Sequence, residues 1–166
     1  MIALASVSLC GATAYAQNKK VPRKQLKSLV NRYKGEDGFD GLNIGKFTMN
    51  MMRAAAKSEA DGDAESEAAL DLMSSLTGMT VADYEDCSAK VRKAFNRDLE
   101  RMLNGVELLM SVKEDGDNVF IYGHILPNGR EVEDVVISVP GDGALVCFFG
   151  RIDMDKVGTL VKMAEE

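Results

Sequence analysis

The chain has 166 residues, which is enough for one domain with a core of ordinary size. Hydrophobic residues make up 46% and charged residues 28%, proportions that exclude an intrinsically disordered chain. The formal net charge of −6 argues against nucleic acid as a partner. This charge is distributed unevenly, because residues 17–34 contain seven basic residues and no acidic residue.

The first sixteen residues have the pattern of a cleaved secretory signal peptide. They are uncharged and end in Ala-Tyr-Ala at positions 14–16, a spacing of small residues that signal peptidase accepts. We expect cleavage after Ala16 and a mature protein in the periplasm or cell envelope. Lipidation at Cys10 is the less favoured alternative, because Leu9 stands where a lipoprotein signal has a small residue. The segment is too short to be a spanning anchor.

Residues 17–34 form a basic N-terminal segment that is expected to be helical from Arg23 to Lys34. Its apolar residues recur at helical spacing, at Leu26, Leu29, Val30 and Tyr33. In one interpretation the cationic side contacts an anionic membrane surface or an unknown envelope protein through Arg23, Lys24, Lys27 and Arg32. In the other, the apolar stripe docks on the rest of the protein and the lysines face water. The second is favoured, because the stripe is narrow and lacks Trp and Phe.

Residues 35–166 are predicted to form a single α+β domain. A helix is expected to follow a Ser66 cap and to end at Gly78, and the helix at 89–103 is expected to end at Asn104-Gly105. The other elements expected before residue 106 are a short strand or extended segment at 39–47, a helix at 49–57 and a β-compatible run at 79–84.

From Val106 onward the hydrophobic period changes to two. Turn signals separate four expected strands, at 106–112, 119–126, 135–139 and 144–149. Val106, Leu108, Met110 and Val112 are expected to share one face. Asp153 is expected to cap a final helix whose inward side holds Val157, Leu160, Val161 and Ala164. The sequence therefore predicts an antiparallel four-stranded, or slightly larger, meander sheet with helices packed on one face and a C-terminal helix.

His124 is the one histidine of the chain and the strongest single candidate for catalysis. It alternates with Phe120 and Tyr122 on a predicted strand. Catalysis by a Ser-His or Cys-His arrangement needs the nucleophile within hydrogen-bond reach, and the neighbouring sequence offers none. A structural or solvent-facing role is therefore favoured, and a hydrolase would need a site assembled from distant residues.

Two other patterns contain residue types that can bind metals, but each pattern is better explained without a bound metal. Asp61, Asp63 and Glu65 alternate like calcium-loop ligands, but the required Gly and Glu at the sixth and twelfth positions are missing. The ten methionines, which include Met49 and Met52, could offer thioethers to copper, yet their spacing favours flexible core filler. We predict a solvated acidic loop at 59–67, and neither a metal nor a cofactor.

The signal peptide leaves two cysteines in the mature chain, Cys87 and Cys147. An oxidising compartment permits a disulfide between them. Both residues lie among apolar neighbours, so buried free thiols are favoured.

Three stretches of the last third show a family resemblance. They are Val-Glu-Leu-Leu-Met-Ser-Val-Lys-Glu-Asp-Gly-Asp-Asn-Val from Val106, Gly-Arg-Glu-Val-Glu-Asp-Val-Val-Ile from Gly129, and Phe-Phe-Gly-Arg-Ile-Asp-Met-Asp-Lys-Val-Gly-Thr-Leu from Phe148. Together with the exported start and the helix before them, they resemble the family called domain of unknown function 4252, small exported proteins of Bacteroidota-type bacteria. The most specific piece runs from Phe149 to Asp155. The resemblance implies an envelope location and an α+β domain, and it implies no reaction, because the family has no established activity.

The leading functional hypothesis is a non-enzymatic envelope domain that acts in interaction or sensing. Its expected contact surfaces are the basic helix at 23–34 and the acidic loop near Asp61. The second hypothesis is a hydrolase built around His124. The third is a lipid- or ligand-binding domain, which would have an enclosed apolar cavity between sheet and helices.

Overall fold

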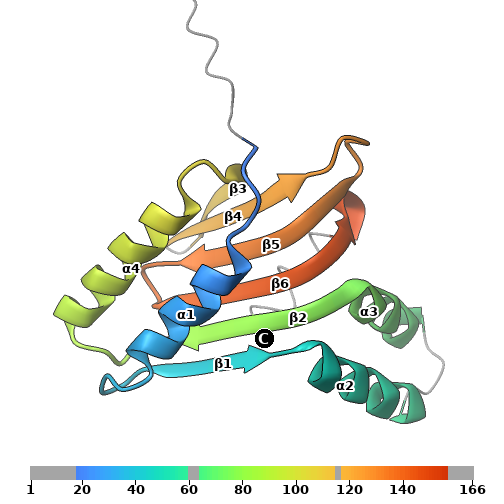
Figure 1. The fold of residues 1–166 in the computed structure, drawn as a ribbon, viewed down its shortest axis with the longest axis horizontal. Helices are drawn as coiled ribbons and strands as arrows, with labels where there is room; N and C mark the ends of the chain where they lie inside the picture. Colours follow the sequence, from blue (N-terminus) through green and yellow to red (C-terminus); the bar gives the residue numbers. More distant parts are fainter. Residues whose placement is uncertain (1–17, 60–63, 115–116, 157–166) are drawn as a thin grey trace, which may run out of the picture.

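The alternating apolar residues of the last third pair into an antiparallel sheet, as predicted (Figure 1). The computed structural model describes residues 18–59, 64–114 and 117–156. Within these ranges the sheet has six strands in the order β1-β2-β6-β5-β4-β3. The strands are β1 Asp40–Ile44, β2 Leu76–Asp83, β3 Glu107–Glu114, β4 Asp117–Ile125, β5 Glu131–Val139 and β6 Ala144–Asp153. Strands β3 to β6 form the predicted meander, and β2 and β1 extend it beyond β6.

The described residues also form four helices, α1 Arg23–Tyr33, α2 Lys46–Glu59, α3 Ala64–Ser75 and α4 Ala89–Leu103. The bounds of α4 agree with the prediction, and Ser88 caps it by accepting a hydrogen bond from the Val91 amide. The helix predicted between Ser66 and Gly78 begins earlier and ends earlier, because Leu76 to Asp83 pair with β6 as a strand. A helical turn at 154–156 follows β6, while the predicted helical residues 157–164 lie outside the described ranges.

Helices pack on both faces of the sheet, so the prediction that they cover one face is wrong in this respect. Helices α1 and α4 lie over the first face (Figure 1), where Leu26 and Phe95 pack with Cys147 and Phe149 of β6. The second core cluster contains Met49 of α2, Leu72 of α3 and Phe148. Successive residues of β6 therefore face opposite helical layers, as the pleat of a strand requires.

The sheet changes register along one transverse line. Register shifts occur between Leu76 and Gly78, Glu133 and Val135, Gly123 and His124, and Leu108 and Met110. At the shift in β5 the extra residue is Asp134, whose φ of 65° lies in the left-handed region. Bulges increase the local twist and turn the following side chains to the other face. The position of this line therefore decides which side chains meet on each side of the sheet.

The bulge in β3 overturns the expectation that Val106, Leu108, Met110 and Val112 share a face. Leu108 pairs with Tyr122 and Met110 pairs with Ile121, and these two partners point to opposite faces of β4. Val106 is buried, but Leu108, Met110 and Val112 are 48%, 51% and 40% exposed on an edge strand. The hydrophobic period identified the strand correctly but could not show the inserted residue.

Gly150 is the residue of β6 at this line, and its φ of 148° favours glycine. A Cβ there would collide with the carbonyl oxygen of Ser75. We predict that Gly150→Ala lowers the free energy of unfolding by about 2–3 kcal/mol, measured by urea denaturation. Gly35→Ala is the control, because no atom lies within 4 Å of the added Cβ. Equal effects of the two substitutions would contradict this account of the bulge.

Candidate functional site

The basic helix docks on the domain through its apolar stripe. Leu26, Leu29 and Val30 are fully buried in the first core cluster, and Tyr33 packs against it. Helix α1 ends at Tyr33, close to the predicted end, and residues 18–22 before it are extended. The predicted docking of the apolar stripe is confirmed, whereas of the lysines of α1 only Lys24 faces water and Lys27 lies half-buried over Phe149.

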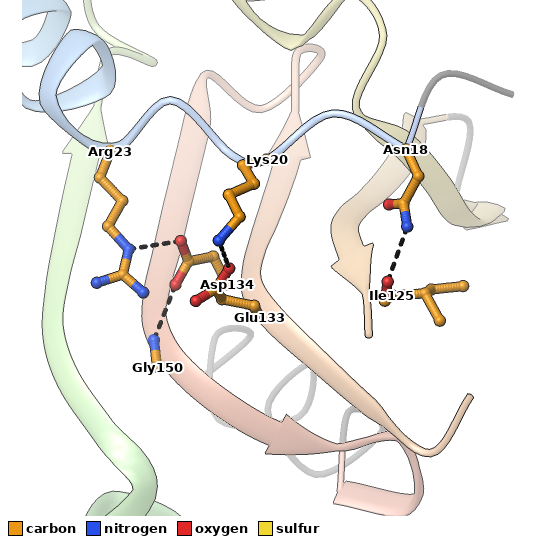
Figure 2. A network of polar contacts seen from close by, with 7 residues as sticks. All are labelled: Asn18, Lys20, Arg23, Ile125, Glu133, Asp134 and Gly150. Carbon is orange, nitrogen blue, oxygen red and sulfur yellow. Dashed lines mark hydrogen bonds and ion pairs between the residues drawn. The ribbon is translucent and has the colours of Figure 1, made fainter. Parts of the chain in front are cut away.

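The extended residues before α1 cross the first face of the sheet and are held there by polar contacts (Figure 2). The Asn18 side chain donates a hydrogen bond of 2.8 Å to the carbonyl oxygen of Ile125. The Lys20 ammonium lies 3.0 Å from Glu133, and the Arg23 guanidinium donates to Asp134 at 2.5 Å. The start of the described chain is thus tied to β4 and β5.

Asp134 is the centre of this network. Its side chain is 4% exposed, and its second carboxylate oxygen accepts a hydrogen bond of 2.9 Å from the Gly150 amide. Burial raises the pKa of Asp134 above its ordinary value of 3.8, although the bonds from Arg23 and Gly150 oppose this shift. Between pH 3.8 and the raised pKa of the folded state, Asp134 holds a proton in the folded protein that it has released in the unfolded chain. Rising pH therefore lowers stability through this group.

The four basic residues predicted as partner contacts have different surroundings. Arg23 and Lys27 lie over the Phe149 ring, at 5.6 Å and 5.3 Å from its centroid. Arg32 is 3.8 Å from Asp98. Lys24 is exposed. Three of the four thus make contacts within the chain, and a partner for this surface stays a prediction.

His124 is half-buried on β4, on the same face as Tyr122, and pairs with Glu133 of β5. Its Nδ1 atom is buried and has no hydrogen-bond partner among the described residues. The hydrogen bond from Lys20 lowers the pKa of Glu133, and His124 contributes only a minor part of that shift. Within the described ranges no Ser, Thr or Cys side chain is hydrogen-bonded to His124. The geometry therefore gives the hydrolase hypothesis no support.

Among the described residues, the two cysteines form no disulfide and the candidate metal ligands form no metal site. Cys87 and Cys147 are buried free thiols, as favoured from the sequence, and burial raises the pKa of both. The described residues contain no group of three or more His, Cys, Asp or Glu side chains that could hold a metal. In the same ranges no helix has the length and apolar character needed to cross a membrane. Residues 60–63 of the acidic loop and Cys10 lie outside the described ranges.

Helix α2 carries an apolar surface that the sequence analysis missed. Met49 is buried in the second core cluster, as predicted for the methionines, but Met51 and Met52 are 60% and 40% exposed. Phe47 is 77% exposed and lies one turn from Met51. The prediction that the methionines fill the core is therefore wrong for the outer side of this helix.

A comparison with family models decides the kinship of the chain. The model described as "Domain of unknown function (DUF4252)" matches residues 33–160, which is most of the chain. The chain belongs to this family. No curated protein and no solved structure matches it.

Membership of the DUF4252 family, which the sequence resemblance indicated, gives the Asp134 network a context. The resemblance included one stretch that contains Asp134 and a second that contains Gly150, and the structure joins them by a hydrogen bond. The most specific piece, from Phe149 to Asp155, thus begins at a bulge that only a glycine fits easily. Asp134 follows Glu131 and Glu133 in the sequence, so it resembles one more acid on a solvent-facing side of the strand, and no signal marked it as buried.

We predict that the Asp134 side chain and its backbone conformation both contribute to stability. Asp134→Ala leaves the Gly150 amide without its acceptor and places Ala at positive φ, so it should cost about 2–3 kcal/mol. Asp134→Asn keeps an acceptor and a residue tolerated at that φ, so it should cost less than about 1 kcal/mol. Thermal and urea unfolding measure both variants. Equal losses for Ala and Asn would contradict this account of the acceptor and the backbone conformation.

Proposed function

We propose that this DUF4252 protein is an exported protein of the cell envelope that acts by binding another protein rather than by catalysis. The proposal for the location rests on the uncharged apolar start and the Ala-Tyr-Ala pattern at 14–16. The proposal for binding rests on one observation above all, the exposed apolar surface of α2. We call Phe47, Met51 and Ala54 the α2 patch; they lie at helical spacing and all three are exposed.

The α2 patch is unusual because the opposite side of the same helix is also apolar. Met49 is only 2% exposed and anchors α2 to the second core cluster. A helix that is apolar on most of its circumference is normally buried on most of it. Phe47 and Met51 are also residue types enriched at protein interfaces, and the flexible thioether adapts to different partners. A second protein that covers Phe47 and Met51 would complete the burial of α2.

The first experiment tests export. We predict that a C-terminally tagged protein, purified from its native cells, begins at Gln17, because the peptidase accepts Ala at 14 and 16. Intact mass and N-terminal sequencing of the membrane and periplasmic fractions measure this. Ala16→Arg should block cleavage and leave the precursor. A product that retains Met1 would overturn the proposed cleavage, and a lipid attached to Cys10 would replace it with the alternative.

The second experiment tests the α2 patch in the cell. We predict that a photo-crosslinking amino acid at Phe47 captures one discrete protein, because this side chain would lie inside the interface. Met51→Glu should reduce the product about tenfold or more, since a charge in an apolar interface is costly. The same probe at the exposed residue Gln25 of α1 is the position control. Equal capture from the two positions, or capture that Met51→Glu leaves unchanged, would contradict the proposal.

A further inference from the structure

A groove runs along α4 on the first face of the sheet, away from the α2 patch. Its inner end is a pocket of about 150 Å³ between α4 and the strands β4 and β5, lined by Leu99, Glu100, Phe120, Tyr122 and Ser138 among others. Two open surface regions of about 510 and 550 Å³ adjoin this pocket along α4, and the second is bordered by residues of α4 alone. Glu100 borders all three spaces, so they adjoin one another.

The floor of the groove is apolar and aromatic. The rings of Phe120 and Tyr122 lie 6.5 Å apart, and both residues are half-buried. Ser138 is 3% exposed and lines the inner pocket. The inner pocket therefore combines an aromatic wall with a hydroxyl at its end.

The wall of the groove is basic. Its charged lining residues all come from α4, and they are four cations and a single acid, Glu100. The cations are Arg92, Lys93, Arg97 and Arg101. Arg92 donates to the carbonyl oxygen of Gly141, and Arg97 makes only an exposed contact of 3.6 Å with the adjacent Asp98. In a protein of net charge −6, this local excess of positive charge favours an anionic occupant.

The dimensions favour a peptide over a small molecule. The lining runs from Ala89 to Asn104 along α4, which is about 22 Å at the rise of an α-helix. An extended peptide covers that length in about seven residues. The two outer regions have the volume of a typical small-molecule site, roughly 300–1,000 Å³, but they are open along the helix. The more enclosed inner pocket of about 150 Å³ is smaller than that range. It has room for one apolar side chain.

We propose that the α4 groove binds an acidic peptide segment of a partner protein, with one aromatic or aliphatic side chain inserted beside Phe120 and Tyr122. The carboxylates of the segment pair with Arg97 and Arg101, which present planar donors suited to them. The groove shares no residue with the α2 patch, so either surface can be tested while the other is intact.

The test uses fluorescein-labelled heptapeptides and the mature protein. The first contains Glu and Asp around one central Phe, the second has Lys in place of every acid, and the third has Ala in place of Phe. Fluorescence anisotropy should show binding of the first, and binding of the second and third weaker by about tenfold or more. Amide NMR shifts should map the first peptide to Glu100, Tyr122 and Ser138.

The variant Arg97→Glu with Arg101→Glu should weaken binding of the first peptide about tenfold or more. Its matched control is Lys46→Glu with Lys57→Glu, which makes the same change in net charge on exposed residues of α2, a helix that packs on the second core cluster. The control should change binding less than about twofold, since its charges are screened from the groove. Circular dichroism confirms that both variants are folded.

Three results would overturn the proposal. The first is equal binding of the acidic and basic peptides, and the second is an equal effect of the two charge variants. The third is that vesicles of phosphatidylglycerol and phosphatidylcholine, but not the acidic peptide, bind in an Arg97- and Arg101-dependent manner, which would assign the groove to a membrane surface. Met51→Glu should leave peptide binding unchanged, so failure of the groove is distinguishable from failure of the α2 patch.

Discussion

The buried carboxylate of Asp134 is the contact on which the arrangement of the sheet depends. It lies at the line where four strand pairs change register, and it accepts the amide of Gly150 across the bulge. Without that acceptor the amide would be buried and unpaired, which is costly in a protein interior. The bulge at Asp134 lets Val132 and Val135 both pack in the second cluster although they are three residues apart, and Val136 then packs in the first cluster.

The same carboxylate joins the N-terminal segment to the domain. Arg23 comes before the start of the family match at residue 33, whereas Asp134 and Gly150 lie inside it. Burial raises the pKa of Asp134, and the half-exposed guanidinium of Arg23 opposes this shift. The Arg23 contact joins the first residue of α1 to β5. It sets where α1 starts, and the apolar stripe of α1 supplies the stabilising contacts.

Much of the fold could be predicted from the sequence because its strongest elements carry a clear period. The stripes of β4 to β6, the helix α4 and the docking side of α1 all follow from residue spacing. The bulges could not be predicted in this way, since one inserted residue leaves the local alternation nearly unchanged. Strand β2 was mistaken in part for the end of a helix because Leu76 continues the helical spacing of α3.

The candidate surfaces were harder to predict, because residue type does not show which side of a helix is covered. In α2, Met49 and Met51 are the same residue type two positions apart, yet one is 2% and the other 60% exposed. The cations of α4 lie on a helix predicted correctly, but only the structure shows that Tyr122 and Glu100 border both the space beside Arg97 and Arg101 and the inner pocket. Such a surface exists only after distant strands pair.

The two proposed surfaces lie on opposite sides of the sheet, and this bears on what a DUF4252 domain can do. Helix α2 contacts the second core cluster, while the α4 groove opens beside the first. The surfaces also differ in chemistry, since the α2 patch is apolar and the groove combines aromatic rings with arginines. Occupants of such different character would not compete for one site. A small domain with two independent surfaces can hold two partners at once, and the rigid sheet between them would fix their spacing.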